Sequence, residues 1–208
     1  MDSGVVQIVA DYVEQTLGRE GYQYICAVVA NCKMLALELD EDEASVLDMD
    51  ALIMAAYLHN ISTVEYGYQG HHIKSAEMAI EFLRELDMPA ALIGKVEQAI
   101  LIHTSVVSSE LRATSPLEGR VLYDADKLGR LSGLAVVTSL IEFGARYPNR
   151  AVTGEVLTAI LRHIEERFVE LYQSLHTAPA RDMARAKFGN TLAFLDGVIE
   201  HLSDATPV

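Results

Sequence analysis

Apolar residues recur every three or four positions along most of this chain, which is the spacing of one face of an α-helix. The first stripe runs over residues 5–17 and stops at Gly18, and a second runs over 25–39. Because glycine favours helix ends, Gly18 predicts a break between two helical stretches. The acidic residues that follow, 40–43, predict a solvated loop.

The next segment, residues 51–60, is apolar on every side, which is typical of a central buried helix, and Asp50 can cap it. Two further stripes over 76–86 and 92–103 predict a fourth and a fifth helix, the latter with Pro89 in its first turn.

The second half of the chain begins with a helix-start signal. Ser115-Pro116-Leu117-Glu118 has the spacing of a capping box, with proline at the first helical position. Further helices are expected over residues 117–129, 131–147, 153–175 and 179–203. No window shows the sustained two-residue alternation of a strand, so we predict an all-α helical bundle.

Length and composition narrow the class of protein. The 208 residues are enough for one sizeable core, and no Pro/Gly/Ser-rich linker divides them, so we expect one domain. The 30 acidic and 16 basic residues argue against a nucleic-acid partner, because phosphate binding uses clustered Lys and Arg. Buried apolar helices would serve a dimer interface as well as a monomer core, so a homo-oligomer stays open.

Membrane insertion and secretion are not expected. No apolar run approaches the roughly 20 residues that span a bilayer, and Asp11 and Glu14 interrupt the N-terminal apolar stretch. Cys26 and Cys32 lie six apart in one predicted helix, on different faces, so a disulfide between them is not expected. A cytoplasmic location, without a membrane partner, is the resulting prediction.

Several histidines and aspartates interrupt these apolar patterns. His103 continues the stripe of its helix and His59 ends the buried one, so both imidazoles should face the interior. A lone core histidine more often has a structural role, and a buried carboxylate needs a cation or several donors. Imidazoles and carboxylates from successive helices can instead converge on a divalent metal ion. The candidates are His59, His71, His72, His103, Asp124 and Asp126.

At these residues the chain resembles the HD-domain metal-dependent phosphohydrolase superfamily, in its small single-domain bacterial branch. The resemblance covers nearly the whole chain. It implies a single HD-like domain over 1–208, with a metal-type core at about 20–130 and C-terminal helices at about 131–204. It rests on the segments AALIMAAYLHNIS, HHIKSAEMAIEFL, AILIHTS, PLEGRVLYDADKLGRLSG and LYQSLHTAPARDMARAKFGNTLAFLDGVIEHL.

Two positions depart from the family's metal motif. Tyr24 stands where the family has its first metal-binding His, and Asn60 stands where it has the Asp of the His-Asp pair. The phenol of a tyrosine has a pKa of about 10, so it stays protonated, and a neutral phenol binds hard divalent ions poorly. Asparagine offers a carbonyl oxygen but cannot bridge two metals as a carboxylate does. The motif therefore retains His59 and Asp126, with Asn60 as a weaker donor.

The resemblance assigns the acidic ligand to Asp126, in Ala-Asp-x-Leu, whereas helical phase places Asp124 on the face of Leu117, Val121 and Leu128. If this helix is buried on all sides, both remain candidates. His71 or His72 and His103 match positions that help hold a second ion in two-metal members. Only one of the two adjacent histidines should face the site, because neighbours on a helix point to different sides.

The resemblance implies a metal-dependent phosphohydrolase acting on a nucleotide or another small phosphoester. The cofactor would be Mn, Fe, Mg, Ni, Co or Zn, held weakly if at all, and it would activate water and polarise a phosphoryl oxygen. Lys74, one turn past His71, is a candidate to pair with substrate phosphate. The alternative is a degenerate member that binds a ligand or regulates. A two-iron oxidase is disfavoured, because Asn60 removes the expected bridging carboxylate.

Overall fold

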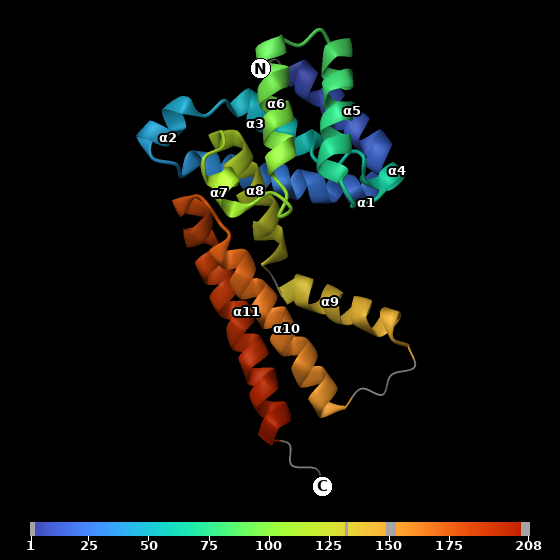
Figure 1. The fold of residues 1–208 in the computed structure, drawn as a ribbon, viewed down its shortest axis with the longest axis vertical. Coiled ribbons are helices and arrows are strands. Elements are labelled where there is room, and N and C mark those ends of the chain that lie inside the picture. Colours follow the sequence, from blue (N-terminus) through green and yellow to red (C-terminus); the bar gives the residue numbers. More distant parts are fainter. Residues whose placement is uncertain (1–2, 132, 149–152, 205–208) are drawn as a thin grey trace. The chain divides into compact units, whose positions relative to one another are not determined.

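The computed structural model describes residues 3–131, 133–148 and 153–204, and every regular element in these ranges is an α-helix (Figure 1). The predicted all-α fold class is therefore confirmed. Position 132, at the start of the predicted 131–147 helix, lies outside the described residues. The helices are α1 (Ser3–Leu37), α2 (Glu41–Val46), α3 (Met49–Leu58), α4 (Thr63–Tyr66), α5 (His71–Glu85), α6 (Ala90–Ile102), α7 (Ser109–Ala113), α8 (Leu117–Arg130), α9 (Gly133–Arg146), α10 (Gly154–Gln173) and α11 (Ala178–Asp204).

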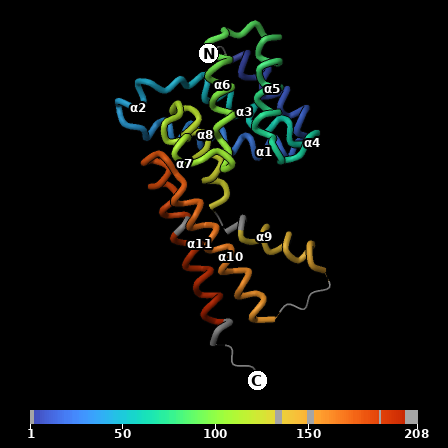
Figure 2. Tube along the Cα trace, in the orientation of Figure 1, coloured from blue at the N-terminus to red at the C-terminus, as the bar shows by residue number. Residues whose placement is uncertain are grey.

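The chain divides into two compact units, and Figure 2 traces the path between them. The first comprises residues 1–126 together with the short return segment 176–179, and the second comprises 127–175 and 180–208. All of the predicted metal-site residues belong to the first unit. That the whole chain is one domain stays a prediction.

Helix α3 forms the centre of the first unit. It packs against both α1 and α6, and α5 packs against α6 in turn. Seven of its ten residues, Ala51–Ala56 and Leu58, are buried, as expected for a segment that is apolar on every side. Its C-terminal end therefore carries His59 into the interior of the unit, where the side chain is fully buried.

Helix α1 contains the predicted break. Gly18 has φ 71° and ψ 175°, a conformation outside the helical region that glycine adopts without a steric penalty. The helix kinks there, so the 3–17 and 19–37 stretches have different axes. The second stretch presents the buried face Ile25, Val28, Val29, Cys32 and Leu35.

Helix α8 begins at Leu117 as predicted, but the cap residue predicted for α3 and the capping-box hydrogen bonds predicted for α8 are wrong. Asp48, not Asp50, caps α3: its carboxylate accepts from the Ala51 amide at 3.1 Å and from the Lys95 ammonium at 2.7 Å. The hydrogen bond from Lys95 lowers the pKa of Asp48. The predicted capping box would pair Ser115 and Glu118 with each other's backbone amides. Instead, Glu118 accepts from the Asp48 amide at 2.8 Å, and the Ser115 hydroxyl donates to the Leu111 carbonyl at 2.7 Å. Tertiary packing of α8 against the start of α3 takes the Glu118 carboxylate away from its own helix.

The acidic segment after α1 is also different from the prediction. Residues 41–46 form the short helix α2 rather than a loop, and Asp40 caps it by accepting from the Glu43 amide at 2.8 Å. Acidic residues in the first turn suit the positive end of a helix dipole, which explains why this composition forms a helix.

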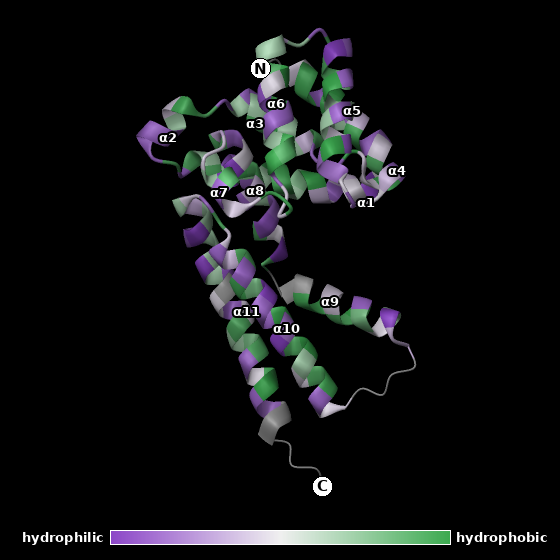
Figure 3. Ribbon diagram, in the orientation of Figure 1, coloured by the Kyte–Doolittle hydropathy of each residue, from purple (hydrophilic) through white to green (hydrophobic). Residues whose placement is uncertain are grey.

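The second unit contains α9, α10 and most of α11. Apolar and polar residues are interspersed along α10 and α11 in Figure 3, and the buried residues of α10, Leu161, Ile164 and Phe168, recur every three or four positions, as in an amphipathic helix. His163 and His201 are exposed on them, as the sequence predicted. Across the part of the chain that the structure describes, no helix is long and apolar enough to cross a membrane.

Gly119 provides a test of the packing between α8 and α6. A Cβ at this position would lie 2.1 Å from Ile102 Cδ1 and 2.3 Å from its Cγ1, so Gly119→Ala should lower the free energy of unfolding by about 1–3 kcal/mol. Gly94→Ala, on α6 where a Cβ meets nothing within 4 Å, is the control and should stabilise by up to about 1 kcal/mol. Urea denaturation of both variants checks this, and equal stability at position 119 would mean that the two helices are not in such close contact.

Candidate metal centre

Three imidazoles in the first unit are anchored in the same way. The Nδ1 atoms of His59, His71 and His103 each contact the backbone carbonyl three residues earlier, at 2.8, 2.8 and 2.5 Å respectively. Because a carbonyl only accepts, each Nδ1 carries the hydrogen, and in the neutral ring Nε2 carries the lone pair. Such second-shell bonds orient the histidines of metal sites.

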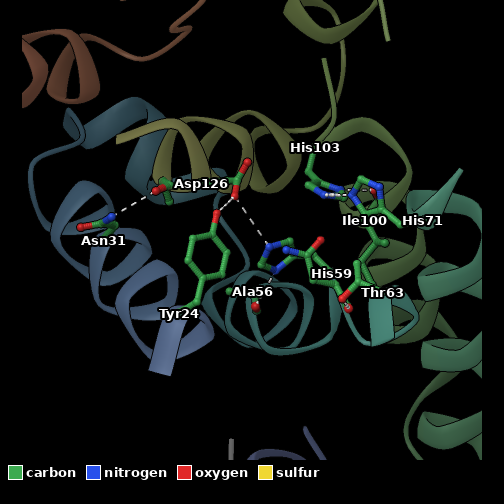
Figure 4. Close-up of polar contacts among 11 residues, drawn as sticks. Tyr24, Asn31, Ala56, His59, Thr63, His71, Ile100, His103 and Asp126 are labelled. Carbon is green, nitrogen blue, oxygen red and sulfur yellow. Dashed lines mark hydrogen bonds and ion pairs between the residues drawn. The ribbon is translucent and has the colours of Figure 1, made fainter. Parts of the chain in front are cut away.

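The Nε2 atoms of His71 and His103 face each other at 3.2 Å, from the start of α5 and the end of α6 (Figure 4). Two neutral rings anchored through Nδ1 would bring two lone pairs together, which is unfavourable unless a cation lies between them. Two nitrogens bound at about 2.0–2.1 Å to a tetrahedral ion lie about 3.3 Å apart. A proton or a metal ion would therefore satisfy this pair.

Asp126 on α8 is approached by two side chains from other helices (Figure 4). The Tyr24 hydroxyl from α1 donates a short hydrogen bond to Asp126 Oδ1. His59 Nε2 lies 3.9 Å from the same oxygen. The rings of His59 and His103 are also in edge contact, with centroids 4.9 Å apart. The two residues that the sequence kept from the motif, His59 and Asp126, are thus brought together.

Helix α8 is buried on all sides between Val121 and Leu128, so both of its aspartates are interior. Asp124 has different partners from Asp126. Its carboxylate accepts from the His176 amide at 2.9 Å, and from the Thr177 amide and hydroxyl at 2.7 Å each. The structure therefore directs Asp124 to the 176–179 segment and Asp126 to Tyr24 and His59. The assignment of either aspartate as a ligand stays a prediction.

The two adjacent histidines of α5 differ as the helical geometry requires. His71 contacts His103, whereas His72 Nδ1 is buried and makes no hydrogen bond with any described residue. Burial, and then the neighbouring His71, lower the pKa of His72. Asn60, which replaces the motif aspartate, is buried and its Oδ1 likewise makes no hydrogen bond within the described ranges. An acceptor in that state suits a ligand, a water molecule or a hydrated ion.

Lys74 is not directed at the histidines. Its ammonium pairs with Glu77 at 2.7 Å, and half of its side chain is exposed. Glu77 raises the pKa of Lys74, chiefly through this hydrogen bond. A phosphate group would have to replace Glu77 to bind Lys74, so its catalytic role stays a prediction.

A second buried network escaped sequence reasoning. Arg112 on α7 donates to the Thr104 and Val107 carbonyls at 2.6 Å each, and its guanidinium stacks 3.8 Å from the centre of the Tyr123 ring. His176, predicted to be exposed, is half-buried and lies 3.2 Å from this guanidinium. Sequence periodicity gave no signal, because the partners come from a loop and a short helix. The network ties the 176–179 segment to α8 through Tyr123, whose ring His176 also contacts.

Asn31 and Cys32 line the same part of α1. Asn31 donates to the Ala125 carbonyl at 3.0 Å and so helps to fix α8. Burial, followed by Asp126 and Asp124, raises the pKa of the Cys32 thiol. A protonated thiol is a poor metal ligand, so Cys32 is not expected to serve as a thiolate donor.

The donors fit a divalent ion by type, but in pairs. Within the described residues, no three His, Cys, Asp or Glu side chains are arranged around one point as a metal requires. Instead His71 pairs with His103 and His59 pairs with Asp126, while the edge contact of His59 and His103 brings the two pairs together. Anchored imidazoles and a buried carboxylate are suitable ligands for Zn, Mn, Fe, Co or Ni.

Comparison with known proteins gives the context of this arrangement. A family model described as HD domain matches residues 24–131. Three solved structures have the same fold. The Lin1889 protein from Listeria innocua has a TM-score of 0.72 at 15% identity, covering 99% of this chain and 100% of its own. An HD-superfamily hydrolase from Bacillus thuringiensis has a TM-score of 0.69 at 17%, covering 97% and 98%.

The third structure is YpgQ from Bacillus subtilis in complex with ADP. Its TM-score is 0.66 at 14% identity, and 94% of each chain is covered. The search of curated proteins found no match. At these identities the solved structures establish the fold, whereas the family model covers more than half of the chain, from Tyr24 through Asp126. The chain belongs to the HD domain family.

Proposed function

We propose that this protein is a divalent-metal-dependent phosphohydrolase that acts on a nucleotide or another small phosphoester. Membership of the HD domain family supports hydrolase chemistry, and the ADP complex of YpgQ supports a nucleotide-like ligand. The observation that carries the proposal is the close approach of His71 Nε2 and His103 Nε2 at 3.2 Å, with both Nδ1 atoms tied to carbonyls. That arrangement calls for a cation between the rings.

The candidate ligands are two pairs of side chains, His71 with His103 and His59 with Asp126. A bound divalent ion supplies a lower pKa for water and polarises a phosphoryl oxygen. The protein's own contribution is to fix three imidazoles through their Nδ1–H bonds, so that the lone pairs keep one orientation. Asp126, only 2% exposed, supplies negative charge where water screens it weakly.

The free cysteines and the net charge bear on the compartment and the partner of the protein. Both cysteines are free, which suits the reducing cytoplasm that we propose as its location. The formal net charge of −14 is unfavourable for nucleic acid or an anionic membrane surface, so the proposed partner is a small phosphorylated molecule.

Metal content tests the proposal. Protein purified without chelators and dialysed against Mn²⁺ and then against metal-free buffer should retain about one ion or more per chain by mass spectrometry. Asp126→Ala and His59→Ala should lose it, because each removes a donor from the centre. His163→Ala, an exposed histidine of the second unit, is the control and should retain the ion. Absence of metal from the wild-type protein would contradict the proposal.

A second function is favoured by a separate observation. The Tyr24 hydroxyl already bonds to Asp126, and Asn60 has replaced a carboxylate, so a member of the family that binds a ligand without metal is the alternative. Such a protein would bind a nucleotide in metal-free buffer and show no turnover with Mn²⁺. Calorimetric titration of ADP with and without Mn²⁺, alongside a phosphoester assay, separates the two functions.

A further inference from the structure

The phenol of Tyr24 and the carboxylate of Asp126 are joined directly inside the candidate metal centre (Figure 4). The bond connects α1 to α8 across 102 positions of sequence, so it results from the tertiary fold and not from local structure. Its acceptor is Oδ1, the same oxygen that lies 3.9 Å from His59 Nε2. Tyr24 therefore contacts the centre at the oxygen that faces the histidine.

A direct O–H···O bond and a metal ion exclude each other between the same two oxygens. Ligand oxygens around a divalent ion are each about 2 Å from it, and the ion occupies the space between them. In a hydrogen bond the proton occupies that space, and the two oxygens approach more closely than two ligands of one ion do. The Tyr24 phenol is neutral, so unlike a carboxylate it adds no negative charge to attract a cation.

We propose that Tyr24 is a latch on Asp126: its hydrogen bond holds the carboxylate in a metal-free arrangement, and divalent metal binds only in competition with that bond. The inference rests on the proposed metal site and names what regulates its occupancy. The bond also gives the carboxylate of Asp126, which is only 2% exposed, the donor that a buried charged group needs.

Competition has two measurable consequences. Removing the hydroxyl takes a donor from a buried carboxylate, which destabilises the metal-free protein while leaving a metal-bound form unaffected. Folding and metal binding form one thermodynamic cycle. A substitution that destabilises only the metal-free protein must therefore make metal binding tighter by the same free energy. A hydrogen bond to a charged group is strong enough that Tyr24→Phe should bind Mn²⁺ about 10-fold more tightly than the wild type.

The experiment compares the full-length wild type, Tyr24→Phe and Tyr22→Phe. Mn²⁺ affinity is measured from the electron paramagnetic resonance signal of free Mn²⁺, and Tm is measured with and without Mn²⁺. Tyr22 is the matched control, because it lies on the same helix and the groups that raise its pKa, Cys26, Tyr57 and Glu14, do not belong to the centre. Tyr24→Phe should have a lower metal-free Tm, tighter Mn²⁺ binding and a larger Mn²⁺-dependent rise in Tm, and Tyr22→Phe should match the wild type in Mn²⁺ affinity.

The double variant Tyr24→Phe with Asp126→Asn should lose the gain in affinity, since the gain acts through the carboxylate. If Tyr24→Phe does not fold without metal, the same comparison is made by refolding with Mn²⁺ at increasing concentrations, where the latch predicts recovery of native circular dichroism. Recovery that does not depend on Mn²⁺, or no recovery, overturns the inference.

The outcomes separate this inference from the proposed function. If the wild type binds Mn²⁺ and Tyr24→Phe binds it equally or more weakly, the latch is overturned and the metal-dependent function stands. Binding by Tyr24→Phe alone would support the latch and overturn metal dependence of the natural protein. No binding by either protein would overturn both.

Discussion

Replacing His71 with alanine is expected to lower phosphoester turnover by about 100-fold or more, whereas the same change at the adjacent His72 should leave it within about twofold. His71 Nε2 faces His103 at 3.2 Å, so its loss removes half of the proposed imidazole pair. His72 has no hydrogen bond to a described residue through its buried Nδ1 and does not contact His103 in that way. The measurement is kcat/KM with saturating Mn²⁺, on the phosphoester that the wild type hydrolyses fastest.

The pair is a matched control, because both changes remove one half-buried imidazole from the first turn of α5. A general loss of folding would affect both variants, and circular dichroism would detect it. Equal turnover in the two variants would mean that the His71–His103 contact has no part in the reaction. A larger loss at His72 would move the site to the other side of the helix.

Replacing Asp124 with alanine is expected to lower the free energy of unfolding by about 3–5 kcal/mol. Its carboxylate accepts from two backbone amides and one hydroxyl of His176 and Thr177, and it is fully buried. Removing it leaves the buried Thr177 donors without this acceptor. Urea denaturation followed by circular dichroism measures the change.

Two further variants sharpen that result. Asp124→Asn keeps one oxygen acceptor and should cost less than alanine, and Asp182→Ala, at a two-thirds exposed position, should change stability by less than about 0.5 kcal/mol. Metal content is measured on the same proteins. An Asp124→Ala protein of normal stability that no longer retains Mn²⁺ would make Asp124 a ligand and would contradict a structural role for its carboxylate.

Periodicity predicted the long helices well because it reports burial directly. Most of the predicted 51–60 and 92–103 stretches lie in α3 and α6, and His59 and His103, which directly follow these helices, are interior as expected. The helix ends were predicted less well. Asp50 and Glu118 have suitable local spacing, but Asp48 and the packing of α8 against α3 decide which groups are bonded. Short helices such as α7 have too few turns to leave a periodic signal.

For the candidate metal centre too, the residue types were predictable from the sequence, whereas their contacts were not. Residue types alone indicated imidazole and carboxylate chemistry, and they indicated that Tyr24 and Asn60 alter it. Residue types could not choose between Asp124 and Asp126. Because α8 is buried on every side, the position of a residue around the helix does not tell whether it is interior. The partners of Arg112 and His176 were missed for a related reason: they depend on a contact between the loop after α6, α7 and the 176–179 segment.

What the sequence determined by itself is the all-α class, the HD-type order of segments and the set of candidate residues for a divalent ion, because spacing and side-chain chemistry are properties of the chain. Only the tertiary structure decided which of these residues meet. It directs Asp124 to the backbone of the 176–179 segment, His71 to His103, and the hydroxyl of Tyr24 to Asp126. Those contacts join residues 32 to 102 positions apart, where the order of residues carries no distance information until the helices pack.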